Sequence, residues 1–290
     1  MLTHETVLNL YSNARLSGAT LDFLEGIKFQ PHDLIDNEKF QIINHVNSDK
    51  KLLKQIFNAN LEVGFCETVD IKKSKETNAS YDSFLAINKK RKSIRKYSQK
   101  PLIFEELCSF LNLFYSITGN EDINFHGEIL NRKIRNIASG GSLYPTEIYI
   151  INNRIEDIKK GAYRYNVINA QLELLVEFDT DKVRKDFLSI IMHDEIRKSN
   201  IDFDNASAFI LFSSVLNRVS SKYQDFGVAL SLIEVGQFIH SAYLSAAALD
   251  LGCCPFGGIL NDKMREFLNI DNFLHYPVLC MSLGNKNNLT

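Results

Sequence analysis

The sequence contains few cysteines, and their spacing argues against two kinds of stabilising site. Five of the 290 residues are cysteine, which is an odd number, and no two of them have the CxxC spacing of a zinc or redox motif. A disulfide framework is therefore not expected, and neither is a metal site. Cys253 and Cys254 are adjacent, and adjacent cysteines pack as small apolar side chains more often than they form a disulfide. The cysteine content predicts a protein of the reducing cytoplasm.

The chain also lacks a net charge that would select a partner. Its 33 lysine and arginine residues balance 35 aspartate and glutamate residues, so the overall charge does not favour nucleic acid. The first residues lack the basic segment and apolar run of a secretory signal, so we expect no export. The apolar stretch from Val228 to Gly252 approaches the length of a membrane span but contains Glu234, Gln237 and His240. It predicts a helix that is apolar on nearly all sides and buried in a core or a subunit interface, not in a membrane.

Hydrophobic periodicity predicts a smaller N-terminal region, residues 1–85, and an α+β domain, residues 86–290. The first region has short helical patterns and ends in a polar stretch, residues 70–80, that is typical of a linker. The second begins with an amphipathic helix over about 104–117, followed by a polar loop. Strands are predicted by alternating or continuous apolar runs at 146–153, as a pair within 161–175, at 208–216 and at 276–284. With the long helix before the last strand, the pattern indicates a sheet covered by helices.

The most basic segment, KKRKSIRK, covers residues 89–96. A charge run of this kind is most often a solvated surface. Here Ser93 lies between Arg91 and Arg95, and guanidinium groups bind phosphate in a bidentate manner while a hydroxyl completes the contacts. The segment is therefore a candidate phosphate site.

A second segment, RNIASGGSLYPTEIYI, covers residues 135–150 and joins a glycine loop to a strand. Gly140 and Gly141 permit backbone angles that other residues avoid, and Ser139 and Ser142 flank them. Such a loop is either a simple turn or a cradle in which backbone groups approach a ligand. It lacks the lysine of a P-loop and the GxGxxG of a dinucleotide fold, which disfavours an ATPase or a Rossmann dehydrogenase.

Two further segments have polar or glycine-rich patterns that are suited to a site. In SKYQDFG, Lys222 and Tyr223 are neighbours that reach one substrate only from a turn or a helix start, because neighbours on a strand face opposite ways. An ammonium beside a phenol favours the phenolate, which is a proton acceptor. In GCCPFGG, Pro255, Gly257 and Gly258 predict a loop between two helices. Alone, the Lys–Tyr neighbours are more often a surface coincidence.

Taken together and in this order, the four segments resemble the nitroreductase superfamily, whose members bind FMN. Within it they resemble the SagB-type dehydrogenases, which form thiazoles and oxazoles in ribosomally made peptides such as microcin B17 and streptolysin S. The resemblance covers about residues 88–287 and includes GAYRY from Gly161, the LIEVG helix, CPFGG and LGNK. It departs from the usual pattern at Ala138, where proline is common, at FGVAL, residues 226–230, where an arginine is common, and at His240 and Ser241, where Gln-Asn is common.

The resemblance implies a role for each segment. Lys222 and Tyr223 would be the catalytic residues. The residues that would bind the FMN cofactor are Arg91, Lys92, Ser93, Arg95, Ser139, Gly140, Gly141, Ser142, Pro255, Phe256, Gly257, Gly258 and Lys286. The implied fold is nitroreductase-like, with a central, mostly antiparallel sheet flanked by helices. The implied assembly is a homodimer with flavin at the twofold interface.

The implied reaction is the oxidation of thiazolines or oxazolines to aromatic azoles in a precursor peptide for a bacteriocin or toxin. The implied partners are that peptide and a YcaO-type cyclodehydratase with its leader-binding partner, and residues 1–85 would dock one of them or simply stabilise the fold. One alternative is an NAD(P)H-dependent nitroreductase or ene-reductase of the same superfamily. Another is a flavin-binding scaffold of a synthetase complex without catalytic activity.

Overall fold

The computed structural model describes residues 15–28, 46, 48–57, 59, 67–71, 78–191, 200–270, 272 and 274–287. The chain divides into two compact units, Met1–Phe29 with Ile87–Thr290, and Gln30–Ala86. In the smaller unit, α4 (Lys50–Phe57) forms within one of the short helical patterns of the N-terminal region. α5 (Ala79–Lys90) crosses the boundary and ends where the basic segment begins. Most of the predicted linker, residues 72–77, lies outside the described residues.

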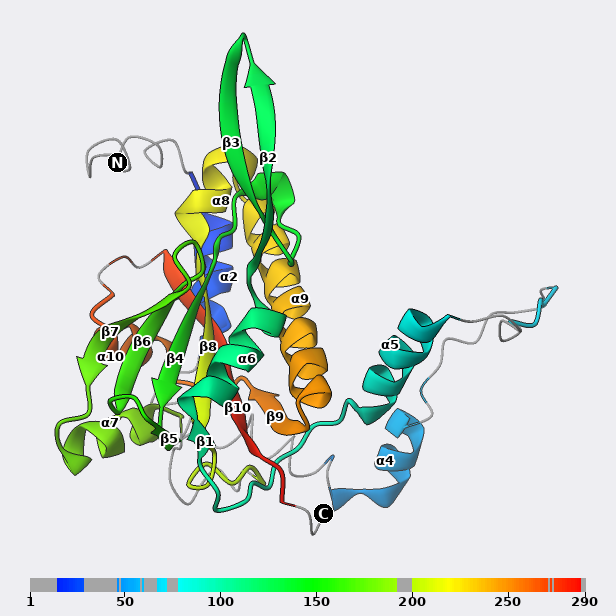
Figure 1. Ribbon diagram of the computed structural model, residues 1–290, viewed down its shortest axis with the longest axis vertical. Helices are drawn as coiled ribbons and strands as arrows, with labels where there is room; N and C mark the ends of the chain where they lie inside the picture. The colour runs from blue at the N-terminus through cyan, green and yellow to red at the C-terminus, as the bar shows by residue number, and fades with distance from the viewer. Residues whose placement is uncertain are drawn as a thin grey trace. The chain divides into compact units, whose positions relative to one another are not determined.

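The larger unit is built on a six-stranded antiparallel sheet with the order β7-β6-β4-β8-β10-β9 (Figure 1). In chain order the strands are β4 (Thr146–Asn152), β6 (Gly161–Asn166), β7 (Gln171–Glu177), β8 (Ala208–Val215), β9 (Leu251–Phe256) and β10 (His275–Asn285). β8 lies inside the sheet and is buried along nearly its whole length, which explains its continuous apolar run. A short parallel pair, β1 (Leu102–Ile103) and β5 (Ile155–Glu156), lies beside the sheet. The predicted α+β fold is confirmed.

Helices cover both faces of this sheet. On one face lie α6 (Phe104–Phe114) and α9 (Phe226–Ala248), and on the other α7 (Asp181–Ile191) and α10 (Asn261–Phe267). Alternate residues of β8 point to opposite faces of the sheet. On one face, Phe212 contacts Phe114 of α6, with 6.1 Å between the ring centroids. On the other, Phe209 contacts Phe187 of α7, with 5.4 Å between the ring centroids. No helix in the described part of the chain is long and apolar enough to cross a membrane.

A sharp corner joins α8 (Leu216–Tyr223) to α9, and the glycine at this corner is required by packing. A β-carbon on Gly227 would lie 3.0 Å from the carbonyl carbon of Val219. The N-terminal helix α2 (Gly18–Gly26) packs at the same corner, where Leu24 lies in a cluster with Leu216 and Val228. The Ser17 amide donates to the Asp225 carboxylate at 2.8 Å. This contact and bonds from the Ser17 and Thr20 side chains lower the pKa of Asp225.

The predicted polar loop after α6 is wrong, because the segment forms a β-hairpin. β2 (Ile117–Phe125) pairs with β3 (Glu128–Arg135), and the hairpin projects away from the sheet (Figure 1). Its two-residue turn has positive φ at His126 (51°) and Gly127 (93°), as the turns that fit the twist of a hairpin require.

The predicted loop at GCCPFGG is also partly wrong. Leu251–Phe256 is the strand β9, and only Gly257 onward is a loop. Among the described residues, β9 is the last strand of the sheet and pairs with β10 alone. Pro255 is tolerated because an edge strand has one side without ladder bonds. Cys253 and Cys254 are buried in it with free thiols, and burial raises the pKa of Cys253 to about 12.

Candidate functional site

The glycine loop, Ser139–Ser142, lies directly against the predicted catalytic pair. Gly141 has a φ of 64°, which favours glycine. A β-carbon at Gly141 would lie 2.8 Å from the hydroxyl oxygen of Tyr223 and 2.9 Å from Nζ of Lys222. The missing side chain therefore provides the space into which both polar groups reach. The paired glycines predicted an unusual backbone here, and the structure shows that this backbone makes room for the ends of the Lys222 and Tyr223 side chains.

The Lys–Tyr pair, Lys222 and Tyr223, occupies the last turn of α8. Lys222 Nζ lies 5.3 Å from the centroid of the Tyr223 ring. Lys222 is exposed and Tyr223 is half-buried. The helix stops at Gln224, whose φ is 49°, so the pair sits at a helix end where neighbouring side chains reach one side. A substrate beside Gly141 can contact both.

A buried carboxylate fixes the glycine loop to α9. Glu234 is 3% exposed and accepts a hydrogen bond from the amide of Thr146 at 3.2 Å and another from the Ser139 hydroxyl. The Ser139 oxygen in turn accepts from the Tyr144 amide at 2.8 Å. Burial raises the pKa of Glu234. Sequence reasoning missed Glu234 as a site residue, although a single acid in an apolar helix was the signal that could have found it.

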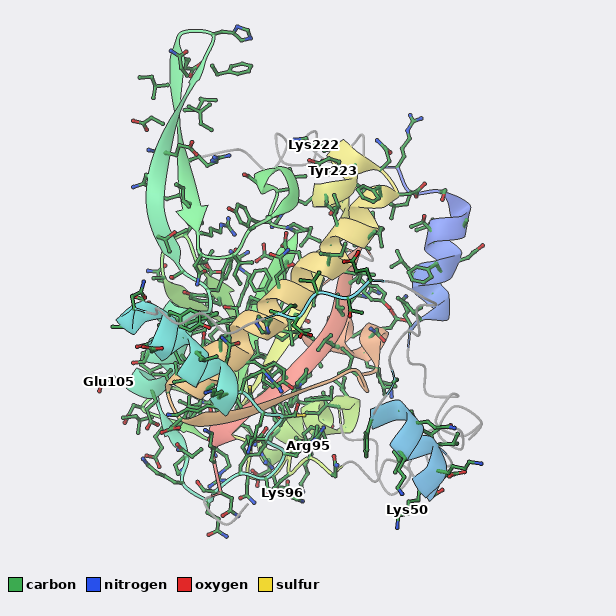
Figure 2. The ribbon with its side chains drawn as sticks, turned by 90° about the vertical axis from the view of Figure 1, so that its right-hand side faces the viewer. Lys50, Arg95, Lys96, Glu105, Lys222 and Tyr223 are labelled. Carbon is green, nitrogen blue, oxygen red and sulfur yellow. The ribbon has the colours of Figure 1, made fainter. Side chains whose placement is uncertain are left out.

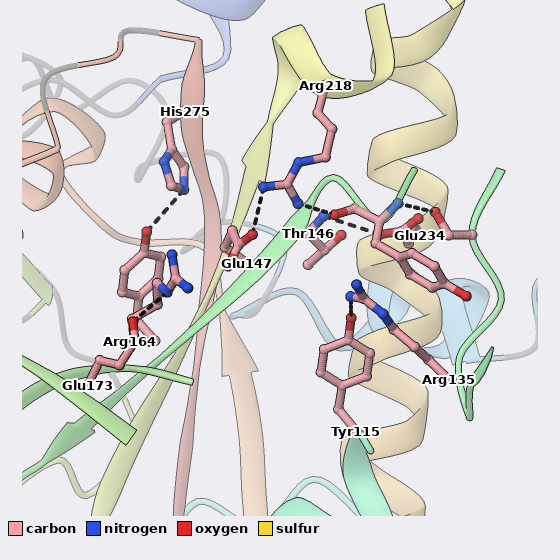
Figure 3. A network of polar contacts seen from close by, with 12 residues as sticks. Tyr115, Arg135, Thr146, Glu147, Arg164, Glu173, Arg218, Glu234 and His275 are labelled. Carbon is pink, nitrogen blue, oxygen red and sulfur yellow. Dashed lines mark hydrogen bonds and ion pairs between the residues drawn. The ribbon is translucent and has the colours of Figure 1, made fainter. Parts of the chain in front are cut away.

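Two arginines hold the end of the loop in place (Figure 3). The Arg135 guanidinium lies 3.8 Å from the centroid of the Tyr144 ring and donates to the Tyr115 hydroxyl. Arg218 donates to the Tyr144 carbonyl and pairs with Glu147 at 2.8 Å. Tyr144 itself has a φ of 46°, an unusual angle for a bulky residue. These contacts keep the loop in one conformation.

Arg91, Ser93 and Arg95 of the basic segment form a second group of candidate residues near the other end of α9. The Ser93 hydroxyl lies 2.6 Å from the Tyr243 hydroxyl, and the Arg91 guanidinium lies 5.1 Å from the centroid of the Tyr243 ring. The Ile94 amide donates to the Cys253 carbonyl at 3.0 Å. The motif order gave no indication of Tyr243.

The other candidates of this group are Lys92 and Arg95 of the basic segment and Lys286, which follows β10. The guanidinium of Arg95 hydrogen-bonds the sulfur of Cys254, and Lys92 is exposed. A β-carbon on Gly252 would lie 2.6 Å from Ile94 and 3.4 Å from Cγ of Lys286, so the segment, β9 and Lys286 converge. Lys286 Nζ contacts Asp250 at 3.4 Å. Arg91 and Ser93 meet at Tyr243, and a guanidinium with a hydroxyl is a donor set suited to a phosphate.

The end of β9 forms a third group, Pro255–Gly258. Pro255 and Phe256 pair with Met281 and Cys280 of β10. The centroid of the Phe256 ring lies 4.9 Å from that of Phe203, and Phe256 is half-buried. A β-carbon on Gly257 would meet nothing within 4 Å, so backbone groups here are open to a ligand.

The structure does not bring the basic segment and the Lys–Tyr pair together within one chain. The pair precedes the N-terminus of α9, whereas the basic segment contacts Tyr243 near its C-terminus. A helix rises 1.5 Å per residue, so Phe226 and Tyr243 are about 25 Å apart. Figure 2 shows Lys222 and Tyr223 far from Arg95 and Lys96. An FMN molecule is shorter than this separation.

A cavity of about 530 Å³ lies along α9 between these two groups. It is lined by Asn136, Ile137 and Ala138 on one side and by residues of α9 from Ile233 to Leu244, including His240 and Ser241, on the other. Ala138, His240 and Ser241 are three of the positions at which the sequence departs from the SagB-type pattern, and all three line this cavity. The departure at residues 226–230 lies outside it.

The described residues include no group of three or more His, Cys, Asp or Glu side chains that could hold a metal ion.

Comparison with known proteins gives matches of two kinds. Residues 89–285 match the Nitroreductase family. A protein of Methanocaldococcus jannaschii that carries the name of a nitroreductase is 26% identical over 197 residues, which cover 68% of this chain and 88% of the relative.

Among solved structures, a chain of the E. coli microcin synthetase McbBCD complex with truncated pro-MccB17 bound has a TM-score of 0.61 and 17% identity, and the match covers 96% of this chain and 100% of that one. A protein of Anabaena variabilis named as a nitroreductase has a TM-score of 0.57 and 20% identity, and the match covers 72% of this chain and 39% of the other. This chain thus spans about two fifths of the Anabaena protein. At these identities the structural matches establish the fold.

Proposed function

This chain belongs to the nitroreductase family, and we propose that it is an FMN-dependent dehydrogenase that oxidises thiazolines and oxazolines of a ribosomally made peptide to thiazoles and oxazoles. Members of the family are flavin-dependent oxidoreductases. The observation that carries the proposal is the Lys–Tyr pair against Gly141. The hydroxyl of Tyr223 and the ammonium of Lys222 both lie beside a backbone that carries no side chain, and we infer that the first is a proton acceptor.

The similarity to the microcin synthetase chain supports the choice of substrate. It extends over 96% of this chain, beyond residues 89–285 that match the family. That chain belongs to a synthetase complex with a truncated peptide precursor bound. We infer that this chain likewise acts on a precursor peptide in the cytoplasm, next to a cyclodehydratase that forms the azolines.

The residues present fit the proposed cofactor. The phosphate would be held by the cationic and hydroxyl groups of Arg91, Lys92, Ser93, Arg95 and Lys286. The ring would lie against the backbones of Ser139–Ser142 and Pro255–Gly258, where glycines leave the main chain uncovered. When bound, FMN supplies the acceptor for the hydride that leaves the azoline.

The Lys–Tyr pair would remove the proton. Tyr223 would accept it from the ring carbon that was the α carbon of the precursor residue, and the electron pair of that C–H bond would form the new ring double bond as hydride leaves the adjacent carbon. Lys222, whose Nζ lies 5.3 Å from the centroid of the Tyr223 ring, would be its electrostatic partner. The glycine loop, fixed by Glu234, holds both groups at one position, which preorganises the site.

We propose that the enzyme is a homodimer in which two chains complete each site. One flavin cannot reach both the basic segment and the Lys–Tyr pair of the same chain, because α9 separates them. Exposed residues on α9, such as Phe226 and Ile233 at 63% and 60%, suit burial by a second copy.

Subunit mixing tests this arrangement. K222A/Y223A chains lack the pair, and R91A/R95A chains lack the phosphate contacts, so each homodimer should be inactive. Mixed dimers contain one complete site if the two groups come from different chains, and activity should return to about a quarter of the wild-type value for random mixing. No recovery in dimers shown by native mass spectrometry to be mixed would contradict the shared site.

The reaction itself is tested by anaerobic reduction of the bound flavin. A thiazoline peptide should bleach the flavin absorbance rapidly in the wild type and at least a hundredfold more slowly in Y223F, because a general base contributes about 10²–10⁴-fold. The matched control is Y81F, which removes the same hydroxyl from an exposed tyrosine of α5 and should bleach at the wild-type rate. Bleaching by NAD(P)H but not by the azoline would favour the nitroreductase alternative, which the name of the Methanocaldococcus relative favours.

A further inference from the structure

The β2–β3 hairpin has one apolar face that no described residue covers. Cross-strand partners share a face, and the pairs Ile123–Leu130 and Phe125–Glu128 lie on the same side as Gly119–Ile134. The apolar face is defined here by Ile123, Phe125, Leu130 and Ile134, which are 38%, 57%, 45% and 39% exposed. The opposite face has the pairs Asn120–Lys133, Asp122–Asn131 and Asn124–Ile129 and is mostly polar.

The apolar face is on the side of the glycine loop. Glu121 and Arg132 pair across the hairpin on this face, and Arg132 also donates to the Ser142 hydroxyl at 3.1 Å. β3 then continues directly into the loop after Arg135. The apolar face therefore leads to Gly141 and to the Lys–Tyr pair beside it.

The hairpin also has free strand edges. Within the described part of the chain, β2 and β3 form a separate two-stranded sheet, so the outer backbone groups of both strands have no ladder partner. An isolated hairpin is marginally stable in water, and a free edge accepts an added strand. The geometry points to a partner that is extended and brings both backbone hydrogen bonds and apolar surface.

We propose that the apolar face and a free edge of this hairpin bind the substrate peptide as an extended strand and deliver its rings to the Lys–Tyr pair. This inference rests on the proposed azoline dehydrogenase function and adds where the peptide lies outside the catalytic site. The hairpin is a binding surface, and the pair remains the catalytic residues.

The charge of this face favours an uncharged occupant. Glu121 and Arg132 neutralise each other, and the further charge on the face, that of Glu128, lies beside the turn. Azoline rings formed from Cys, Ser or Thr are flat and uncharged, so they fit this face, whereas a nucleic acid or an acidic segment would find no cationic stripe. Residues between the rings keep their amides and can pair with a strand edge.

The test compares charged substitutions on the two faces. Leu130→Lys places a charge on the apolar face, and Ile129→Lys places the same charge one residue away on the opposite face, where the Ile129 side chain is also exposed, at 67%. Thermal unfolding and flavin content of both holoenzymes show whether either variant is damaged. The probes are a fluorescent thiazole-containing peptide long enough to follow β2, and a small thiazoline amide with no flanking residues.

L130K should weaken peptide binding about tenfold or more in fluorescence anisotropy, as expected from losing a partly buried leucine contact, and should lower kcat/KM for a thiazoline peptide in proportion. I129K should leave both values within about twofold, and both variants should oxidise the small amide at the wild-type rate. Equal effects of L130K and I129K, or no effect of either, would overturn the proposal. So would loss of the dimer in L130K by analytical ultracentrifugation, since the face would then bind a second copy. Failure of the wild type to oxidise the small amide would refute the proposed function instead, and peptide binding would still be measurable.

Discussion

Replacing Gly141 by alanine tests whether the glycine loop and the Lys–Tyr pair form one site. The backbone there has a φ of 64°, and the left-handed region costs a residue with a β-carbon about 1–2 kcal/mol. The new methyl would also lie 2.8 Å from the Tyr223 hydroxyl oxygen and 2.9 Å from Lys222 Nζ. Each atom must then move by roughly half an ångström to reach ordinary contact. Both are ends of flexible side chains, so we expect a folded protein with a displaced pair.

The expected magnitude follows from these two effects. The unfolding temperature should fall by about 2–8 °C, because about 1 kcal/mol shifts it by roughly 2–4 °C in a chain of this size. The kcat for a small thiazoline amide should fall about ten- to a hundredfold, since a misplacement approaching 1 Å can lower a rate by about 10². The assay is thiazole formation followed by absorbance at saturating FMN, beside a thermal melt of the same preparation.

A matched variant separates strain from displacement. Gly127 also has a left-handed backbone, with a φ of 93°, but a β-carbon there would meet nothing within 4 Å. Gly127→Ala should therefore lose a similar amount of stability and keep its kcat for the small amide, which does not extend along the hairpin. Full kcat in Gly141→Ala despite the loss of stability would refute the reasoning, because the pair would not depend on the loop.

Three further predictions concern single side chains. Glu234→Gln should flatten the pH dependence of urea unfolding: burial raises the pKa of Glu234, so its stabilising contribution is present below about pH 4.3 and is lost as pH rises through the raised pKa. Lys286→Met should raise the Kd for FMN about tenfold in flavin fluorescence titrations, whereas Lys96→Met, which changes an exposed lysine at the end of the basic segment, should not. Burial lowers the pKa of His275 to about 4, so stability should be lost as pH falls from about 6.5 toward 4, by about 1–2 kcal/mol at pH 5; His275→Asn should not show this loss in the same unfolding series.

Much of the fold was predictable because its core elements have strong periodicity. α6 places Leu107, Phe110 and Phe114 on one buried face, which is the spacing of an amphipathic helix. The run at 208–216 predicted a buried strand, and β8 is one. Where covering helices bury both faces of a strand, the sequence is apolar without alternation, and that signal is strong.

The hairpin and β9 were not predictable by the same criterion. β2 is rich in Asn, Asp and Glu, residues that are depleted in strands, and it forms a strand because its partner pairs with it across a tight turn. The His126–Gly127 dipeptide was the usable signal, since a residue followed by glycine between two runs is typical of a hairpin turn. In β9, Pro255 and the neighbouring glycines suggested a loop, but an edge strand tolerates proline.

The candidate site was predictable as a set of residues and not as an arrangement. Motif order identified the glycine loop and the Lys–Tyr pair, and the structure places them in contact. The order of the motifs did not predict the distance between the Lys–Tyr pair and Ser93, because the length of α9 sets this distance. It also gave no sign that Ala138 and His240 line one cavity. These facts depend on tertiary packing.

The most direct test of the central claim is mass spectrometry of an azoline-containing peptide incubated with the FMN-loaded protein in air. The account predicts a loss of about 2 Da for each ring, because oxidation removes two hydrogens, and no loss with the K222A/Y223A variant. An unchanged peptide mass in the presence of a protein that binds FMN and is fully folded would contradict it.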